Sequence, residues 1–168
     1  MKILETNPSE IPRSCDRSKA FQPAVQPSHL YLVTAHDLRD LSDKLAKGQV
    51  PLDLETKLTK LATGELSHCF IERNCRTIID LVMAAQKGSF GPVEQVDLVR
   101  LLQVLAYIRK DDDAIPDYRA DGFTDDQREL RAAVTQLAPL LRNFKAWRLR
   151  HHVPRRWSCT GELAHTTV

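Results

Sequence analysis

The sequence predicts an all-α protein, a single-domain bundle of five or six helices, and two observations support this fold class. Apolar residues recur at spacings of three and four through most of the chain, and glycines or prolines separate the segments that show this helical spacing. No convincing strand alternation is found. The short segment 29–34 (HLYLVT) is the one candidate, and a lone strand has nothing to pair with. The expected architecture is therefore a helical bundle.

The composition fits one folded domain with polar ends. The chain has 168 residues, of which 42% are hydrophobic, and this is enough for one core. Residues 1–27 hold four of the nine prolines, so we expect a flexible arm there. We expect the helical domain to cover residues 28–157 and a short polar tail to cover 158–168.

Charge and targeting features favour a cytoplasmic protein. The net charge of +2 gives no overall attraction to nucleic acid or to anionic membranes. No segment approaches the roughly 20 apolar residues of a membrane span, and the first residues lack the apolar core of a signal peptide. The four cysteines are scattered and form no C-x-x-C pair, which is typical of a cytosolic protein with free thiols.

Four helices are predicted before residue 111, in segments 34–48, 52–64, 65–88 and 91–110. Thr34 and Asp37 resemble a capping box, glycines end the first three segments, and Pro92 suits a first helical turn. The apolar stripes that predict these helices are Leu38, Leu41 and Leu45; Leu54, Leu58 and Leu61; Ile71, Cys75, Ile78, Val82 and Ala85; and Leu98, Leu101, Leu102, Leu105 and Ile108.

A last helical region is predicted over residues 125–152. Thr124 and Gln127 have the spacing of a capping box at its start. A straight helix of this length would extend about 42 Å, roughly the width of a domain of this size. Because Pro139 cannot donate to the carbonyl of Thr135, we expect a kink or break near Pro139.

The stretch between the last two predicted helical regions is strongly acidic. It carries seven aspartates and one base, Arg119, between positions 111 and 126. The structural interpretation explains the most residues: Asp113 accepts backbone N–H groups in a turn, Pro116 stiffens that turn, and Gly122 permits a positive φ. Asp125 and Asp126 then lie in the first turn of the next helix, where negative charge is favourable.

Two functional interpretations of the acidic stretch stay open beside the structural one. Clustered carboxylates suit a hard divalent cation, although the spacing of an EF-hand loop is absent. An acidic surface also suits docking to a protein partner. The candidate residues for either role are Asp113, Asp117, Asp125 and Asp126.

The same stretch resembles the signature of the YkvA-like family, a short helical domain of unknown function. The matching elements are Asp113-x-Ile115-Pro116-Asp117 and Gly122-Phe123-x-Asp125-Asp126. The chain departs from the family between these elements, at residues 118–121, where the family is usually more apolar. The family has no settled activity, so the resemblance implies a helix–turn–helix geometry and no particular chemistry.

A basic segment follows near the C-terminus. It has six Lys or Arg residues and no acid between positions 142 and 157, with Trp147 and Trp157 interleaved. A solvated helix end explains this charge, because cations favour helix C-termini. Nucleic acid or an acidic partner is the alternative, and the basic end could also fold back on the acidic bend. The candidate residues are Arg142, Lys145, Arg148, Arg150, Arg155, Arg156 and Trp157.

These observations favour a non-catalytic protein-interaction module with no cofactor. It would present the acidic bend and the basic helix end to a protein partner. Nucleic-acid binding by residues 142–156 is the second hypothesis, and a divalent-metal-dependent hydrolase that uses the four aspartates is the third. The sequence does not define the oligomeric state.

Overall fold

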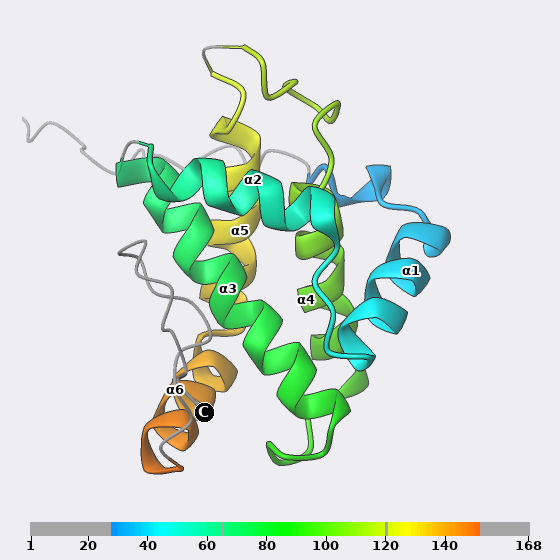
Figure 1. The fold of residues 1–168 in the computed structure, drawn as a ribbon, viewed down its shortest axis with the longest axis vertical. Helices are drawn as coiled ribbons and strands as arrows, with labels where there is room; N and C mark the ends of the chain where they lie inside the picture. Colours follow the sequence, from blue (N-terminus) through cyan, green and yellow to red (C-terminus); the bar gives the residue numbers. More distant parts are fainter. Residues whose placement is uncertain (1–27, 65, 120, 152–168) are drawn as a thin grey trace, which may run out of the picture.

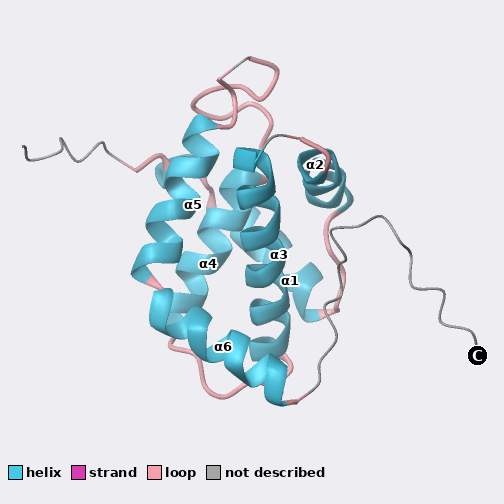
Figure 2. Cartoon of the chain, turned by 90° about the vertical axis from the view of Figure 1, so that its left-hand side faces the viewer, coloured by secondary structure: helices cyan, strands magenta, loops and turns pink. Residues whose placement is uncertain are grey.

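The structure, a computed structural model, describes residues 28–64, 66–119 and 121–151, and the regular elements within this range are helices joined by loops (Figures 1 and 2). The expected arm at 1–27 and tail at 158–168 lie outside this range. The described part has no strand, and this confirms the predicted fold class. Its elements are the 3₁₀ helix η1 (Leu30–Leu32) and the α-helices α1 (Ala35–Ala46), α2 (Leu52–Ala62), α3 (Leu66–Gln86), α4 (Gln95–Ile108), α5 (Thr124–Gln136) and α6 (Ala138–Arg150).

Helix α3 organises the bundle because it packs against each of the other five α-helices. It is also the longest helix, with 21 residues. Four residues of its predicted stripe are fully inaccessible to solvent, Ile71, Cys75, Ile78 and Val82, whereas the fifth, Ala85, is half-buried. Helix α4 lies beside it and packs against α1, α5 and η1 as well. The core is therefore built between α3 and α4, and the remaining helices cover it.

Most residues that were predicted to begin or end a helix lie at a helix end in the structure. Thr34 and Asp37 form a reciprocal capping box at the start of α1, with distances of 3.2 and 2.9 Å between the backbone nitrogens and side-chain oxygens. Gly48 and Gly88 have φ angles of 76° and 66°, which suit glycine after a helix end. The prediction for Pro92 was wrong, since α4 begins at Gln95 and Pro92 lies in the preceding loop.

The segment 29–34 forms no strand. Leu30–Leu32 is a short 3₁₀ helix whose Leu30 is buried. The segment is held from outside by α5: the backbone N–H of His29 and the hydroxyl of Ser28 donate to the buried carboxylate of Glu129, at 2.9 and 2.7 Å. A side chain 100 residues away in sequence therefore fixes this conformation.

The predicted break near Pro139 is confirmed. Helix α5 ends at Gln136, and α6 begins at Ala138 with the proline in its first turn, where no backbone donor is needed. The break turns α6 towards the end of α3 (Figure 2). There Phe144 and Trp147 pack with Phe90 of the α3–α4 loop, with ring centroids 5.3 and 5.5 Å from that of Phe90.

The described helices also bear on membrane association. None of them is both long enough and apolar enough to cross a bilayer.

The central position of α4 gives a stability prediction. Leu105 is fully buried, so Leu105→Ala should lower the free energy of unfolding by about 2–5 kcal/mol, through lost burial and the cavity left behind. Val96→Ala is the matched control on the same helix, because Val96 is 67% exposed and should change stability by less than about 0.5 kcal/mol. Urea denaturation of both variants checks this, and equal losses would contradict the assignment of Leu105 to the core.

Candidate functional site

The acidic loop, residues 111–123 between α4 and α5, lies at one end of the bundle (top of Figures 1 and 2). Its aspartates and those that open α5 divide into two sets. Asp113, Asp117, Asp125 and Asp126 are half-buried or buried, and we call them the inner carboxylates. Asp111, Asp112 and Asp121 are exposed, and we call them the outer carboxylates.

Lys57 of α2 lies among the inner carboxylates and is only 6% exposed. Its Nζ is 2.7 Å from Oδ2 of Asp117 and 3.1 Å from Oδ2 of Asp126, and it donates to the carbonyl of Lys110 at 2.8 Å. Burial acts to lower the pKa of Lys57, but the charge of Asp126 and the hydrogen bond of Asp117 outweigh it, so the pKa is raised. The ammonium therefore stays charged and links α2, the end of α4, the loop and α5.

Asp125 has a different set of partners. Its Oδ2 accepts from the hydroxyl of Tyr107 at 2.6 Å and from the backbone N–H of Ile115 at 3.1 Å. Both Asp125 and Tyr107 are fully buried. This pair joins the start of α5 to α4 and to the loop, so the prediction of Asp125 as a turn-and-helix-start residue is supported.

Asp113 holds the turn as predicted. Its Oδ1 accepts from the N–H of Ile115 at 3.3 Å. One oxygen each of Asp113, Asp117 and Asp126 lie within 4.8 Å of one another, so three of the four candidate metal ligands converge. The fourth, Asp125, is outside this group and is committed to Tyr107 and Ile115.

Asp113, Asp117 and Asp126 have raised pKa values. Burial, followed by the charge of Asp125, raises the pKa of Asp113 to about 7. Burial also raises the pKa of Asp117 to about 6, against the opposing hydrogen bond of Lys57. Burial raises the pKa of Asp126 well above its ordinary value, and Lys57 offsets this only in part.

Two structural predictions for the loop need correction. Gly122 has no positive φ; the positive φ angles among the described glycines are at Gly48 and Gly88. Glycine is needed at 122 for space, because a Cβ there would lie 2.7 Å from the carbonyl oxygen of Pro116 and 2.7 Å from Cα of Asp117. Thr124 and Gln127 form no capping box, since Phe123 is the N-cap residue and makes no side-chain capping bond.

The loop that carries the outer carboxylates also carries an exposed aromatic ring. Tyr118 is 86% exposed, and the side chain of Asp121 is 54% exposed and pairs with Arg119 at 3.2 Å. Asp111 and Asp112 are exposed at the beginning of the loop. The inner side chains hold the loop against the bundle, and the outer ones face solvent.

The described part of the basic segment, residues 142–151, lies at the opposite end of the bundle from the acidic loop (bottom of Figures 1 and 2). Arg142, Lys145 and Arg150 are exposed on α6. Arg148 is half-buried and pairs with Asp80 of α3 at 3.1 Å, so it helps to hold α6 against α3. The described part of this segment therefore does not fold back on the acidic loop. The remaining candidates Arg155, Arg156 and Trp157 lie outside the described residues.

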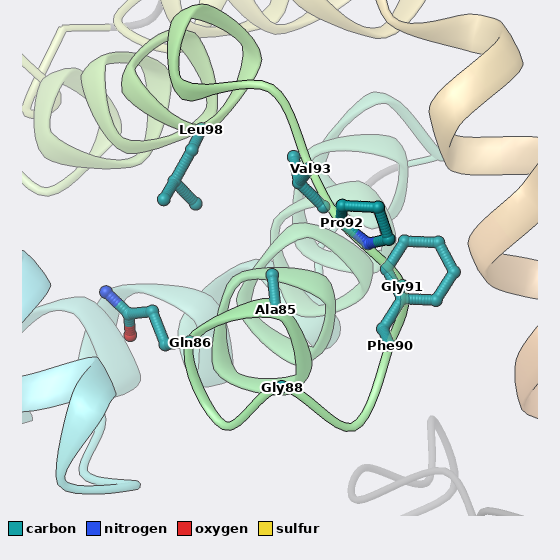
Figure 3. A pocket seen from close by; sticks show the side chains of 8 residues that line it. All are labelled: Ala85, Gln86, Gly88, Phe90, Gly91, Pro92, Val93 and Leu98. Atoms are coloured by element: carbon teal, nitrogen blue, oxygen red, sulfur yellow. The ribbon is translucent and has the colours of Figure 1, made fainter.

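An open hollow of about 400 Å³ lies between the end of α3 and the start of α4 (Figure 3). Leu98 and Ala85 face each other across it, whereas the ring of Phe90 lies on the side of α6. The amide nitrogen of Gln86 donates to Ser42 at 3.0 Å. The hollow is lined by Ala85, Gln86, Gly88, Phe90, Gly91, Pro92, Val93 and Leu98, and it brings together no charged groups.

Sequence reasoning missed two residues of the inner cluster, Lys57 and Tyr107. Lys57 carries a signal, because it falls at helical spacing within an apolar stripe, between Leu54 and Leu61. A polar group within such a stripe must find a buried partner. The partners of Lys57, however, are more than 50 positions away in sequence, so the stripe could not identify them.

The close approach at Gly122 gives a second prediction. Gly122→Ala should destabilise the protein by about 1–3 kcal/mol, because the backbone of Pro116 and Asp117 must move to admit the methyl group. Gly91→Ala is the control: nothing lies within 4 Å of a Cβ there, and its change should stay within about 1 kcal/mol. Thermal and urea unfolding measure both, and a neutral Gly122→Ala would refute the steric role.

The raised pKa values predict a pH dependence. Between the unfolded pKa of 3.8 and the folded values of about 6 and 7, the native state binds protons at Asp117 and Asp113 that the unfolded chain does not. The free energy of unfolding should therefore rise as the pH falls from about 7.5 to about 5. The pKa of Asp37 is lowered to about 2, so this carboxylate changes the free energy of unfolding with pH only below this range.

Urea unfolding across that pH range, with a chelator present, measures this dependence. The Asp113→Asn variant should show a smaller rise than the unmodified protein, and Asp112→Asn, at an exposed position, should not. Identical pH profiles for Asp113→Asn and the unmodified protein would contradict the assignment to Asp113.

Comparison with known proteins adds no relative: no family model, no curated protein and no solved structure matches this chain.

Proposed function

We propose that this chain is a non-catalytic helical interaction module that associates with further copies of itself, acidic end to basic end. The observation that supports this is the placement of the two charged surfaces. The acidic loop and the exposed cations of α6 lie at opposite ends of the bundle, so they cannot neutralise each other within one chain (Figure 2).

The two surfaces are complementary in more than charge. Tyr118, which is 86% exposed, lies in the same loop as the outer carboxylates. On α6, Arg142, Lys145 and Leu149 follow one another at spacings of three and four, so they share one face, and Leu149 is 78% exposed. Each surface therefore combines one large exposed side chain with charged groups, and an apolar contact with a polar rim is typical of protein interfaces.

The inner carboxylates support a binding role for the loop. They attach the loop to α2, α4 and α5 through Lys57 and Tyr107, so the outer side chains are presented on a backbone that is already ordered. A preorganised loop loses less conformational entropy when it binds. The resemblance to the YkvA-like signature is consistent with this geometry and stays a prediction.

Head-to-tail pairing is heterologous, so it produces open chains of molecules, or rings where the rotation between neighbours closes. Exposed ion pairs contribute only about 0–1 kcal/mol each. We therefore expect the average mass to rise with protein concentration at about 0.01 M salt and to return to the monomer mass at about 1 M, where the Debye length is only about 3 Å. Sedimentation equilibrium measures this.

Two neutralising variants test which surfaces pair. One carries Asp111→Asn, Asp112→Asn and Asp121→Asn, and the other carries Arg142→Gln, Lys145→Gln and Arg150→Gln. Each alone should remain monomeric, whereas their mixture should form a 1:1 complex and nothing longer, since one intact end remains on each. A control with Arg39→Gln, Lys47→Gln and Lys60→Gln, three exposed cations elsewhere, should associate like the unmodified protein.

A mixture that stays monomeric would refute the proposal. Nucleic acid is the competing partner for the basic surface. If the unmodified chain is monomeric at low salt but binds an oligonucleotide through Arg142, Lys145 and Arg150, that second function replaces the first. The logarithm of the association constant would then fall by about 0.9 per phosphate contact for each tenfold rise in salt concentration.

A further inference from the structure

The inner carboxylates carry more negative charge than their neighbours neutralise. Asp113, Asp117 and Asp126 surround one ammonium group, that of Lys57, and Lys57 contacts only Asp117 and Asp126 among them. When all three carboxylates are ionised, two negative charges are left over, which is the charge that one divalent cation neutralises. Asp126 is fully buried, so water cannot screen this excess.

Each of the three carboxylates also has an oxygen that is buried without a hydrogen-bond partner among the described residues. These atoms are Oδ2 of Asp113, Oδ1 of Asp117 and Oδ1 of Asp126. Lys57 holds the Oδ2 atoms of Asp117 and Asp126, so the ammonium leaves their Oδ1 atoms available. A charged acceptor that is buried and unpaired destabilises a fold unless a ligand satisfies it.

The spacing of the three groups allows one cation to contact all of them. Two oxygens on opposite sides of a calcium ion are separated by twice the metal–oxygen distance, about 4.6–5.2 Å. Ligand oxygens from the three aspartates all lie within 4.8 Å of one another, so all three are close enough to bind one such ion. Asp113 and Asp117 are only half-buried, which leaves access for waters to complete the six to eight ligands that calcium takes.

We infer that Asp113, Asp117 and Asp126 form a binding site for one calcium-sized divalent cation, held between the acidic loop and the start of α5. The ion joins two carboxylates of the loop to one of the helix, on the side of the cluster that Lys57 leaves open. The inference does not depend on the proposed association, which uses the outer carboxylates.

The experiment is a calorimetric titration of the full chain with calcium, after removal of bound metal with a chelator and exchange into chelator-free buffer. Magnesium and an equivalent ionic strength of sodium chloride are parallel arms. We expect one calcium per chain, weaker binding of magnesium and no saturable heat from sodium. At about 100 times Kd, calcium should raise the Tm by about 5–10 °C.

Conservative variants separate a built site from general attraction to an acidic surface. Asp126→Asn and Asp113→Asn should each weaken calcium binding by at least about 10–100-fold, the range seen when only an outer-shell partner is lost. Asp112→Asn, an exposed change in the same loop, should bind calcium like the unmodified chain. Far-UV circular dichroism without metal verifies that each variant is folded, and Asp113→Asn, at a half-buried position, provides the test if Asp126→Asn does not fold.

Two results would overturn the inference. One is the lack of a saturable calcium heat and of a Tm shift in the unmodified chain. The other is calcium binding that is equally strong in Asp113→Asn, Asp126→Asn and Asp112→Asn, since this would mean that the ion is held only by the general negative charge of the loop.

Discussion

The buried ammonium of Lys57 is the constraint on which this end of the molecule depends. It is held by the carboxylates of Asp117 and Asp126 and by the carbonyl of Lys110, so one group joins α2, the end of α4, the acidic loop and α5. A buried charge is tolerated only when each partner is in place, and the loss of one partner commonly costs about 3–5 kcal/mol. The course of the loop is therefore coupled to the packing of three helices.

This coupling explains why the loop can be both strongly acidic and ordered. The inner carboxylates are engaged with Lys57, Tyr107 and backbone N–H groups, whereas the outer ones face solvent. Burial, together with the charges of neighbouring carboxylates, raises the pKa of Asp113, and one oxygen each of Asp113, Asp117 and Asp126 is buried without a donor among the described residues. The proposed cation and the proposed partner use different sides of one loop, so binding at one side can order the other without a shared residue.

The charge distribution along the bundle follows from the same division of roles. Arg148 pairs with Asp80 and helps to attach α6 to α3, while Arg142, Lys145 and Arg150 remain exposed. Between the two charged ends the helices pack through an apolar core. The proposed association uses this distribution, and salt would weaken such contacts between the charged ends of two copies.

The sequence by itself determined the helices, because helical periodicity and glycine or proline at the ends depend on residues close together in the chain: the stripe of α3, the capping box at Thr34 and the break before Pro139 were all predictable. It also identified Asp113 as a turn residue. Only the tertiary structure decided that Lys57 lies among the aspartates, that Gly122 is required for space and that Glu129 holds the segment at His29. Each of these depends on groups brought together from separate elements, and local spacing carries no information about which distant groups will meet.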